Sequence, residues 1–295
     1  MLTRTPRTFA PGLISDRIWL AVSLLATALA LASCAALQPP DATGPRGNLK
    51  LYPILFTEDN RRKESVAVAL NRLGVQAGNP DSTEAQLQPV TATILNISPK
   101  TNSALYLPKV GAAAVMNEEE TRESLRRFIR EWQELIGSDP AKLSLLERVD
   151  QPDGSKLASY EQRPFRYPIR GNYGKLQIRF TADRRVLNVT SSCIPDAERI
   201  QTALSGFSIR LRSREAIQRL RDQGLEYADA KGTKVNIKFP AASQITPRGL
   251  VTYVLPAKDT PEGLEFHLAW EIELSNAPIK LAYIDAITSA TIAVE

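Results

Sequence analysis

Cysteine and histidine are the side chains best suited to covalent or metal chemistry, and this chain has two cysteines and one histidine among its 295 residues. A thiolate nucleophile needs a nearby base, and His267 is the sole imidazole that could activate Cys193. Nothing in the sequence brings these two residues together. Zinc hydrolases usually hold their metal with two or three imidazoles. We therefore expect no transition-metal site, no cofactor and no enzymatic activity.

The surroundings of Cys34 predict a different chemistry. Arg4, Arg7 and Arg17 give the first segment a positive charge, and residues 18–31 then run without a charged side chain. As a helix this run would rise about 21 Å, less than the ~30 Å hydrocarbon core of a bilayer. The length is typical of the core of a secretory signal and short for a membrane-spanning helix.

The apolar run ends in a sequence that resembles the lipobox of bacterial lipoproteins. Leu31, Ala32 and Ser33 stand where the lipoprotein signal peptidase reads small residues, and Cys34 stands where the modified cysteine follows the cut. The resemblance implies that residues 1–33 form a cleaved signal peptide and that Cys34 carries the lipid. An uncleaved membrane helix that ends in cysteine is the alternative.

Residues 34–47 have the composition of a flexible, lipidated tether, with three prolines and two glycines. Several lipid chains on one cysteine would hold the protein firmly on a membrane. Ala35 stands where an Asp would resemble an inner-membrane retention signal. In a Gram-negative cell we expect the outer membrane facing the periplasm, and in a Gram-positive cell the outer face of the cytoplasmic membrane. Removal of residues 1–33 lowers the formal net charge from +5 to +3, which indicates no particular partner.

Residues 48–112 form an N-terminal region that is hard to define from sequence. Its pattern predicts a short helix that is capped by Asp59 or its neighbour and closed by Gly74. Residues 90–97 and 104–110 are apolar and separated by a turn-rich segment, which predicts a hairpin.

A strong helix signal opens the next region, residues 113–196. Asn117 followed by Glu120 is typical of a capping box, and Gly137 is a suitable helix end. The apolar positions between them recur at three- and four-residue steps, as on one helix face: Leu125, Phe128, Ile129, Trp132, Leu135 and Ile136. Apolar and polar residues then alternate in three segments between residues 157 and 190. This order predicts a helix packed on an antiparallel meander.

The same order recurs in residues 205–295. Ser213 can cap a helix that ends at Gly224, and residues 264–274 are apolar at every second position. The polar side of that strand carries four residues that a partner could contact: Glu265, His267, Glu271 and Glu273. Asp285 is expected to brace a turn. The predicted fold class is α+β, with two tandem small units that each pack a helix on an antiparallel sheet.

The first of these units resembles the FTP domain of fungalysin and thermolysin propeptides. Residues 127–137 match a helix that ends in Gly, residues 143–149 a strand, and residues 160–162 a Tyr-x-Gln strand. Residues 183–186 stand for an Asp-Gly-Arg-Val turn, with Arg184 in place of its glycine. The resemblance implies a cystatin-like fold.

The second unit resembles a PepSY domain. Residues 268–272 are similar to its Leu-Ala-Trp-x-Val strand, and residues 283–292 to its Tyr-Val-Asp-Ala-x-Thr-Gly-Glu-Val segment, with Ser289 in place of glycine. In metalloproteases such modules precede the protease, shield its cleft and assist its folding. The resemblance covers roughly residues 115–295, and no His-Glu-x-x-His motif occurs in this sequence.

These patterns favour a non-catalytic protein-binding module on a lipid anchor, which holds, inhibits or chaperones an envelope protease or another exported client. The polar face of residues 264–274, or an exposed edge strand, would receive the client. A structural or small-ligand-binding envelope lipoprotein is the alternative from another class, and a hydrolase ranks third. Basic and aromatic residues interleave between 163 and 179, but export argues against a nucleic-acid partner.

Overall fold

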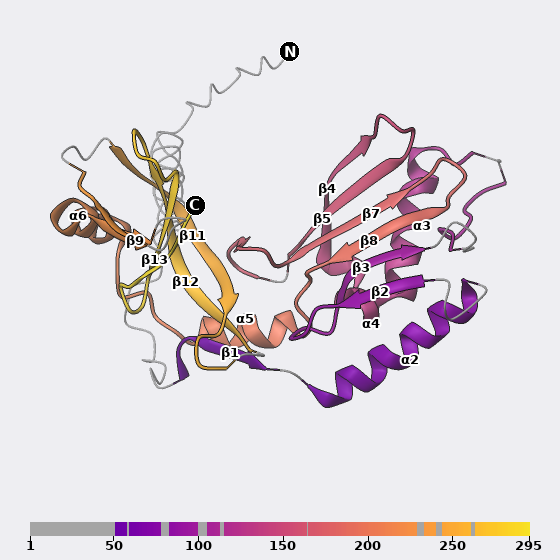
Figure 1. Cartoon of the computed structure of the whole chain (residues 1–295), viewed down its shortest axis with the longest axis horizontal. Coiled ribbons are helices and arrows are strands. Elements are labelled where there is room, and N and C mark those ends of the chain that lie inside the picture. The colour runs from indigo at the N-terminus through magenta and orange to yellow at the C-terminus, as the bar shows by residue number, and fades with distance from the viewer. Residues whose placement is uncertain are drawn as a thin grey trace, which may run out of the picture. The chain divides into compact units, whose positions relative to one another are not determined.

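The computed structural model describes residues 51–57, 59–77, 83–99, 105–112, 115–163, 165–228, 233–239, 244–260 and 263–295. The predicted signal peptide, Cys34 and the predicted tether lie outside the described residues. Residues 45–295 belong to one compact unit. Its class is α+β, as predicted: the described strands form two six-stranded sheets and one two-stranded ribbon, accompanied by helices (Figure 1).

The first sheet is antiparallel and runs in the order β2-β3-β8-β7-β5-β4. Its strands are β2 (Thr83–Leu87), β3 (Ile94–Pro99), β4 (Leu143–Asp150), β5 (Lys156–Gln162), β7 (Lys175–Phe180) and β8 (Val186–Ser191). The predicted meander is confirmed as β5, β7 and β8, whose alternate apolar residues are buried. Strand β4 forms one edge of this sheet.

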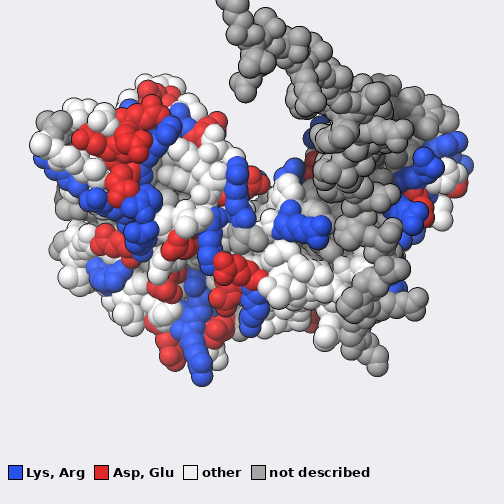
Figure 2. Space-filling view, turned by 180° about the vertical axis from the view of Figure 1, so that it is seen from behind, with Lys and Arg blue, Asp and Glu red and all other residues white. Residues whose placement is uncertain are grey.

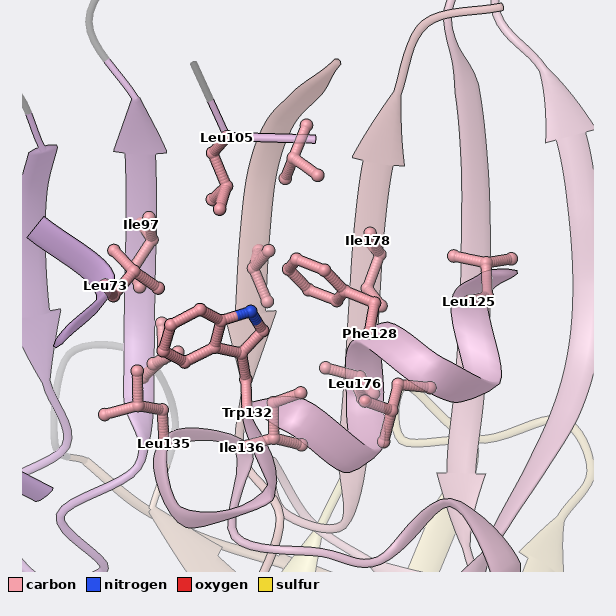
Figure 3. Packing of buried hydrophobic residues seen from close by; sticks show 14 of the residues in the cluster. Leu73, Ile97, Leu105, Leu125, Phe128, Trp132, Leu135, Ile136, Leu176 and Ile178 are labelled. Atoms are coloured by element: carbon pink, nitrogen blue, oxygen red, sulfur yellow. The ribbon is translucent and has the colours of Figure 1, made fainter. Parts of the chain in front are cut away.

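Helices α3 (Glu118–Glu131) and α4 (Gln133–Ile136) supply the apolar stripe that packs on the first sheet. The predicted capping box is confirmed, because Asn117 Oδ1 accepts the amide of Glu120 at 2.9 Å and Glu120 Oε2 accepts the amide of Asn117 at 2.9 Å. Figure 3 shows Trp132, at the junction of the two helices, beside Leu135 and Phe128 in the core. Gly137 ends α4 at a φ of 83°, in the left-handed region that glycine tolerates.

Helix α2 (Asn60–Gln76) packs beside α4. Asp59 caps it, accepting the amide of Arg61 at 2.9 Å. The predicted end at Gly74 is two residues short. The buried stripe of α2 continues through Leu73, and the amide of Ala77 still bonds to the carbonyl of Leu73 at 2.9 Å.

The predicted hairpin of residues 90–97 and 104–110 is wrong. Strand β3 pairs with β2 on one side and β8 on the other. Within the second predicted segment, Tyr106 makes an isolated bridge to Arg185. Strand β2 (Thr83–Leu87) is mostly polar, so its sequence pattern predicts a loop and not a strand. An edge strand tolerates polar residues because part of it faces solvent.

The second sheet runs in the order β14-β13-β12-β11-β6, and β1 pairs with β12 as well. Its strands are β1 (Ile54–Thr57), β6 (Ile169–Arg170), β11 (Ile245–Pro256), β12 (Gly263–Leu274), β13 (Leu281–Asp285) and β14 (Thr291–Val294). All pairs are antiparallel except β6 with β11. The predicted strand at residues 264–274 is confirmed as β12.

Helices α5 (Ala197–Ser205) and α6 (Ser213–Gln223) contribute to the apolar clusters on one side of β12. Trp270 packs in these clusters, and its Nε1 donates to the carbonyl of Leu211 at 2.7 Å. The cap of α6 is Arg212 and not Ser213, because Arg212 is still extended and Ser213 is the first helical residue. The short helix η4 (Pro140–Lys142) and the ribbon of β9 (Leu225–Ala228) and β10 (Lys234–Ile237) complete the described elements.

Two strands of the second sheet come from outside residues 205–295. Figure 1 shows the indigo β1 beside the orange and yellow strands, although some 200 residues of chain separate it from β12. Strand β6 follows β5 in the chain yet pairs with β11, where Ile169 is the partner of Thr252. Residues 48–112 are therefore no separate region, since they give β1 to one sheet and β2 and β3 to the other.

Candidate functional site

The polar side of β12 carries the four residues predicted to contact a partner, Glu265, His267, Glu271 and Glu273. Much of this side is shielded from solvent. His267, Glu271 and their neighbours lie opposite the apolar side that meets α5 and α6, as the alternation predicts. The Glu271 side chain is 4% exposed and the His267 side chain 13%. A carboxylate so far from water requires a partner from the same chain.

Glu271 finds its partner in β6. Arg170 donates from Nε to Glu271 Oε2, and Arg248 places a second guanidinium 3.8 Å from the other oxygen. Arg248 also pairs with the more exposed Glu273 at 3.2 Å. A partner that docked at Glu271 would first have to break these ion pairs. Glu271 therefore does not have the predicted role of a contact residue, and it holds β6 on the sheet instead.

His267 occupies a junction between two strands. Strands β1 and β13 pair with the same edge of β12, β1 at Gly263–Phe266 and β13 at Ala269–Glu273. His267 Nδ1 lies 2.7 Å from Asp285 Oδ2, and the hydroxyl of Tyr52 donates to the same oxygen at 2.9 Å. Tyr52 also accepts the amide of Leu268 at 3.0 Å. The junction thus ties the segment before β1 to the end of β13.

Asp285 braces its turn, as predicted, because its Oδ1 accepts the amides of Ile287 and Thr288 at 2.8 Å each. Burial acts to raise the pKa of Asp285, but hydrogen bonds from His267 and these two amides outweigh it and hold the pKa below its usual value. Burial and the neighbouring Asp285 charge raise the pKa of Tyr52. A hydroxyl held in its neutral form is suited to donate a hydrogen bond, which indicates a structural role.

Cys193 is inert in this fold. Its side chain is fully buried in the first-sheet core, and its Sγ lies 3.8 Å from the carbonyl oxygen of Lys175. Burial raises the pKa of the thiol to about 12, so very little thiolate forms near neutral pH. The hydrogen bonds of His267 go to Asp285 and Glu265, so the structure does not bring Cys193 and His267 together.

Two arginines of the basic segment between residues 163 and 179, Arg170 and Arg179, are engaged by carboxylates of this chain. Phe165 stacks on Phe266, with ring centroids 6.3 Å apart, so it is not displayed for a base. Figure 2 shows basic and acidic side chains intermixed over the face of the molecule turned to the viewer.

A polar cleft of about 260 Å³ lies where α2, α4 and the start of α5 meet. Arg62 enters it from α2, and its Nε and Nη2 donate to the carbonyls of Thr91 and Glu134 at 2.7 and 2.8 Å. Burial lowers the pKa of Arg62. Other lining residues carry both signs of charge: Lys142, Glu134, Asp139 and Asp196. The mixture suits a small polar ligand better than an apolar one.

A second hollow, of about 380 Å³, lies between α3 and the edge strand β4. We call it the β4 groove and define it by its lining residues: Arg122, Arg126, Ile129, Pro140, Leu143, Leu145 and Tyr160. Leu143 and Leu145 belong to β4 itself and are partly buried. Within the described part of the chain, no strand pairs with the outer side of β4. An apolar groove thus adjoins an unpaired sheet edge.

A β-bulge turns a further arginine, Arg148, to the α3 side of β4. The pairing of β4 with β5 shifts between Leu145 and Glu147, so Leu146 is the extra residue. After the shift, Arg148 pairs with Ala158, which lies in the core beneath α3. Arg148 accordingly reaches the α3 side, where its Nη2 lies 3.8 Å from Glu118.

Sequence reasoning named an edge strand in general terms but missed this groove. Strict alternation places Leu145 and Glu147 on one face and Arg148 on the other. The bulge reverses that assignment, and no residue type in this segment marks its position. The sequence shows only that Leu145 and Leu146 are consecutive apolar residues, which breaks strict alternation without locating the extra residue.

Among the helices that the structure describes, none is long and apolar enough to cross a membrane. Within the same described residues, no three His, Cys, Asp or Glu side chains lie close enough together to hold a metal ion.

Comparison with known proteins leaves the chain without an assigned family. No family model matches it, and no curated protein matches it. A crystal structure of an uncharacterized protein from Eubacterium rectale ATCC 33656 aligns over 82% of this chain and 84% of its own, with 9% sequence identity and a TM-score of 0.32.

Proposed function

We propose that this chain is a non-catalytic, lipid-anchored envelope protein that binds another exported protein by receiving an extended segment at the edge of β4. The observation that carries the proposal is the outer edge of β4 beside the β4 groove, with which no strand of the described residues pairs. An exposed edge can accept a further strand through main-chain hydrogen bonds, while adjacent pockets take alternate side chains. The client would be an envelope protease or a similar exported protein, which the module holds, inhibits or helps to fold.

The tether sets how far the module can reach. About 17 residues separate the proposed lipid at Cys34 from Leu51, so a fully extended tether spans at most about 60 Å. A flexible chain of this length has a root-mean-square span of roughly 20–25 Å. The tether would therefore keep Leu51, where the described residues begin, close to the membrane surface.

The resemblance to FTP and PepSY modules, with units at residues 113–196 and 205–295, is part of this proposal. Arg184 and Ser289 stand where those families usually have glycine, and both have positive φ, 74° and 65°. Glycine adopts that region readily, so the backbone at both turns suits the family pattern. Gln162 of the Tyr-x-Gln strand bonds to both backbone groups of Ile194, at 2.8 and 2.9 Å.

The second candidate, a small-ligand-binding lipoprotein, is favoured by the polar cleft at Arg62. That cleft has charged groups of both signs and a volume that suits a small zwitterion. Arg62 already bonds to two carbonyls, so a ligand would have to share its guanidinium. We rank this function second for that reason.

Photo-crosslinking tests the docking proposal. A photoreactive phenylalanine analogue would replace Leu146, which is 57% exposed on β4, in the full-length protein expressed in its own cells. The control carries the same analogue at Leu95, another exposed apolar residue of the first sheet, which lies on β3. We expect a discrete protein adduct from position 146 and none from position 95. Equal adduct patterns, or none at 146, would contradict the proposal.

The anchor needs its own test. Mass analysis of the mature protein should find a lipid-modified Cys34 at the N-terminus, and Cys34→Ser should yield a larger, unprocessed or mis-sorted form. An unmodified peptide that begins before residue 34 would contradict the anchor and leave the binding edge untouched.

A further inference from the structure

We infer that the His267 junction is a pH-sensitive switch, which holds β1 firmly on β12 while the imidazole is protonated and loosens it when the imidazole is neutral. The inference goes beyond the proposed function and does not depend on it. Two observations carry it: the gap in strand pairing at which the ring lies, and the carboxylate that faces each of its nitrogens. Because β1 is the first described strand of the chain, its release would lengthen the free segment in front of the sheet.

The ring of His267 lies beside a gap in the strand pairing of β12. On one edge of β12, β1 pairs with residues 263–266 and β13 pairs with residues 269–273. Between these two partners, the Tyr52 hydroxyl accepts a hydrogen bond from the amide of Leu268 at 3.0 Å and donates to Asp285 Oδ2 at 2.9 Å. The attachment of the segment before β1 therefore depends on the same carboxylate oxygen that His267 contacts.

Each ring nitrogen of His267 faces a carboxylate oxygen. Nδ1 lies 2.7 Å from Asp285 Oδ2, and Nε2 lies 3.3 Å from Glu265 Oε2. A neutral imidazole has one N–H group and the protonated ring has two, so only the protonated ring can donate to both carboxylates. The side chains of His267, Glu265 and Asp285 are 13%, 17% and 1% exposed. Water therefore does little to screen a nitrogen lone pair from a carboxylate here.

The titratable groups that face the ring from neighbouring segments keep their charge between pH 5.5 and 8.5. Although burial acts to raise it, hydrogen bonds from His267 and two turn amides hold the pKa of Asp285 below its usual value, so this carboxylate stays ionised. Burial and the Asp285 charge raise the pKa of Tyr52. Tyr253, the partner of His267 on β11, also stays neutral, because burial raises its pKa to about 12. Beyond β11, the guanidinium of Arg170 is held in its own ion pair.

The geometry gives the direction of the switch. Histidine ordinarily changes charge between about pH 5 and pH 8. The contact with the buried Asp285 is the shorter one, so Nδ1 keeps its proton when the ring becomes neutral, and the repulsion falls on Glu265 at Nε2. Glu265 is the partner of Leu55 in the pairing of β12 with β1. The contribution of His267 to holding β1 is therefore present in acid and lost as the pH rises.

Hydrogen–deuterium exchange of the purified mature protein in detergent would measure how firmly β1 is held. Protection factors of residues 54–57 would be compared at pH 5.5 and pH 8.5, each against the intrinsic exchange rate at that pH, with residues 156–162 of β5 as the internal control. We expect the protection of β1 to fall about tenfold at the higher pH, the size expected for loss of one hydrogen bond between charged groups. The protection of β5 should change less than threefold.

Three variants assign the change to the junction. Glu265→Gln replaces the second carboxylate with an amide that can donate to a neutral Nε2, so the protection of β1 should differ less than threefold between the two pH values. His267→Gln should also abolish the difference, because the chain has no other imidazole. Glu273→Gln is the matched control on the same side of β12. Its carboxylate pairs with Arg248 and not with the ring, so it should keep the full tenfold fall.

A protection of β1 that does not change with pH in the parent protein would overturn the inference. An undiminished fall in Glu265→Gln or in His267→Gln would do the same, and so would an equal fall in β1 and β5, since that would report a general loss of stability. If His267→Gln does not fold, Glu265→Gln still decides the outcome, because it keeps the ring and its contact with Asp285 and changes only the group that faces Nε2.

Discussion

The first sheet is built mostly from neighbouring segments of the chain, whereas the second gathers strands from distant ones. Strands β4, β5, β7 and β8 all lie within residues 143–191, where only β6 interrupts them, and they share one core with the helix that precedes them. The core strand of the second sheet, β12, has its partners at residues 54–57, 245–256 and 281–285. One sheet is thus encoded locally, and the other depends on remote parts of the chain.

The two sheets also differ in how they treat charge. Around α3, ion pairs such as those of Glu123 lie at the surface, and the core beneath is apolar. In the second sheet, the carboxylates of Glu271 and Asp285 are buried and hold β6 and the Tyr52 segment in place. Buried charges are costly without their partners. We therefore expect the second sheet to unfold when distant segments are removed. The first sheet should lose stability when a core side chain is truncated.

The largest effect should follow from removing the distant segments. A fragment of residues 205–295 lacks β1, β6 and α5, which leaves Glu271 without Arg170 and Asp285 without Tyr52. We expect it to show no cooperative transition in a urea titration followed by tryptophan fluorescence. Residues 45–295 should unfold in one cooperative step under the same conditions. A cooperative transition of the short fragment would mean that the second sheet is as self-contained as the first.

Loss of a core side chain in the first sheet should come next. Trp132 is fully buried, and Trp132→Ala should lower the free energy of unfolding by about 3–5 kcal/mol. Trp270 is half-buried, so Trp270→Ala should cost about 1–3 kcal/mol.

Trp132→Phe is the control for this pair. The indole Nε1 of Trp132 is buried without a hydrogen-bond partner in the described structure, so phenylalanine keeps the aromatic contacts and removes an unsatisfied donor. Chemical denaturation of the three variants would measure the differences. Equal losses for Trp132→Ala and Trp270→Ala would contradict the expectation that the fully buried indole contributes more.

The buried carboxylate of the second sheet should give a smaller, pH-dependent effect. Because the pKa of Asp285 is lower in the folded state, the ionised form stabilises the fold above the unfolded pKa of about 3.9, and this contribution is lost as the pH falls through the lowered folded value. Asp285→Asn should cost about 2 kcal/mol at pH 7, and the difference from the parent should shrink below pH 4. Denaturant titrations at pH 7 and pH 3 would measure it. A pH-independent difference would contradict the assignment.

The smallest expected effect is a gain in the free energy of unfolding. Ser289 holds a φ of 65°, and Ser289→Gly should raise the free energy of unfolding by about 0.5–1 kcal/mol, because glycine relieves the strain but adds freedom to the unfolded chain. Arg184→Gly should gain less, since Arg184 Nη1 donates to the carbonyl of Leu107 at 3.1 Å. Thermal unfolding of both variants would test this order, and a loss in Ser289→Gly would contradict it.

The sequence predicted what local physics determines. The capping box at Asn117, the stripe through Trp132 and the alternation along β12 all arise within a few residues. The burial of Glu271 is not determined locally, because its partner Arg170 lies 101 residues away. The side of the sheet on which Arg148 lies is not determined locally either, because a single extra residue in β4 moves it to the other side. Long-range pairing and bulges leave little trace in local composition, and the candidate site depends on both.

Because Cys193 is buried, its oxidation would mark molecules that have unfolded at least once. A thiol without solvent contact and with little thiolate reacts with oxidants or alkylating reagents only after the first-sheet core opens. In an oxidising compartment, folded molecules would keep a free thiol, while chains that had opened would form covalent dimers or mixed disulfides. A non-reducing gel of protein from aged cells would then separate molecules that stayed folded from those that had once unfolded.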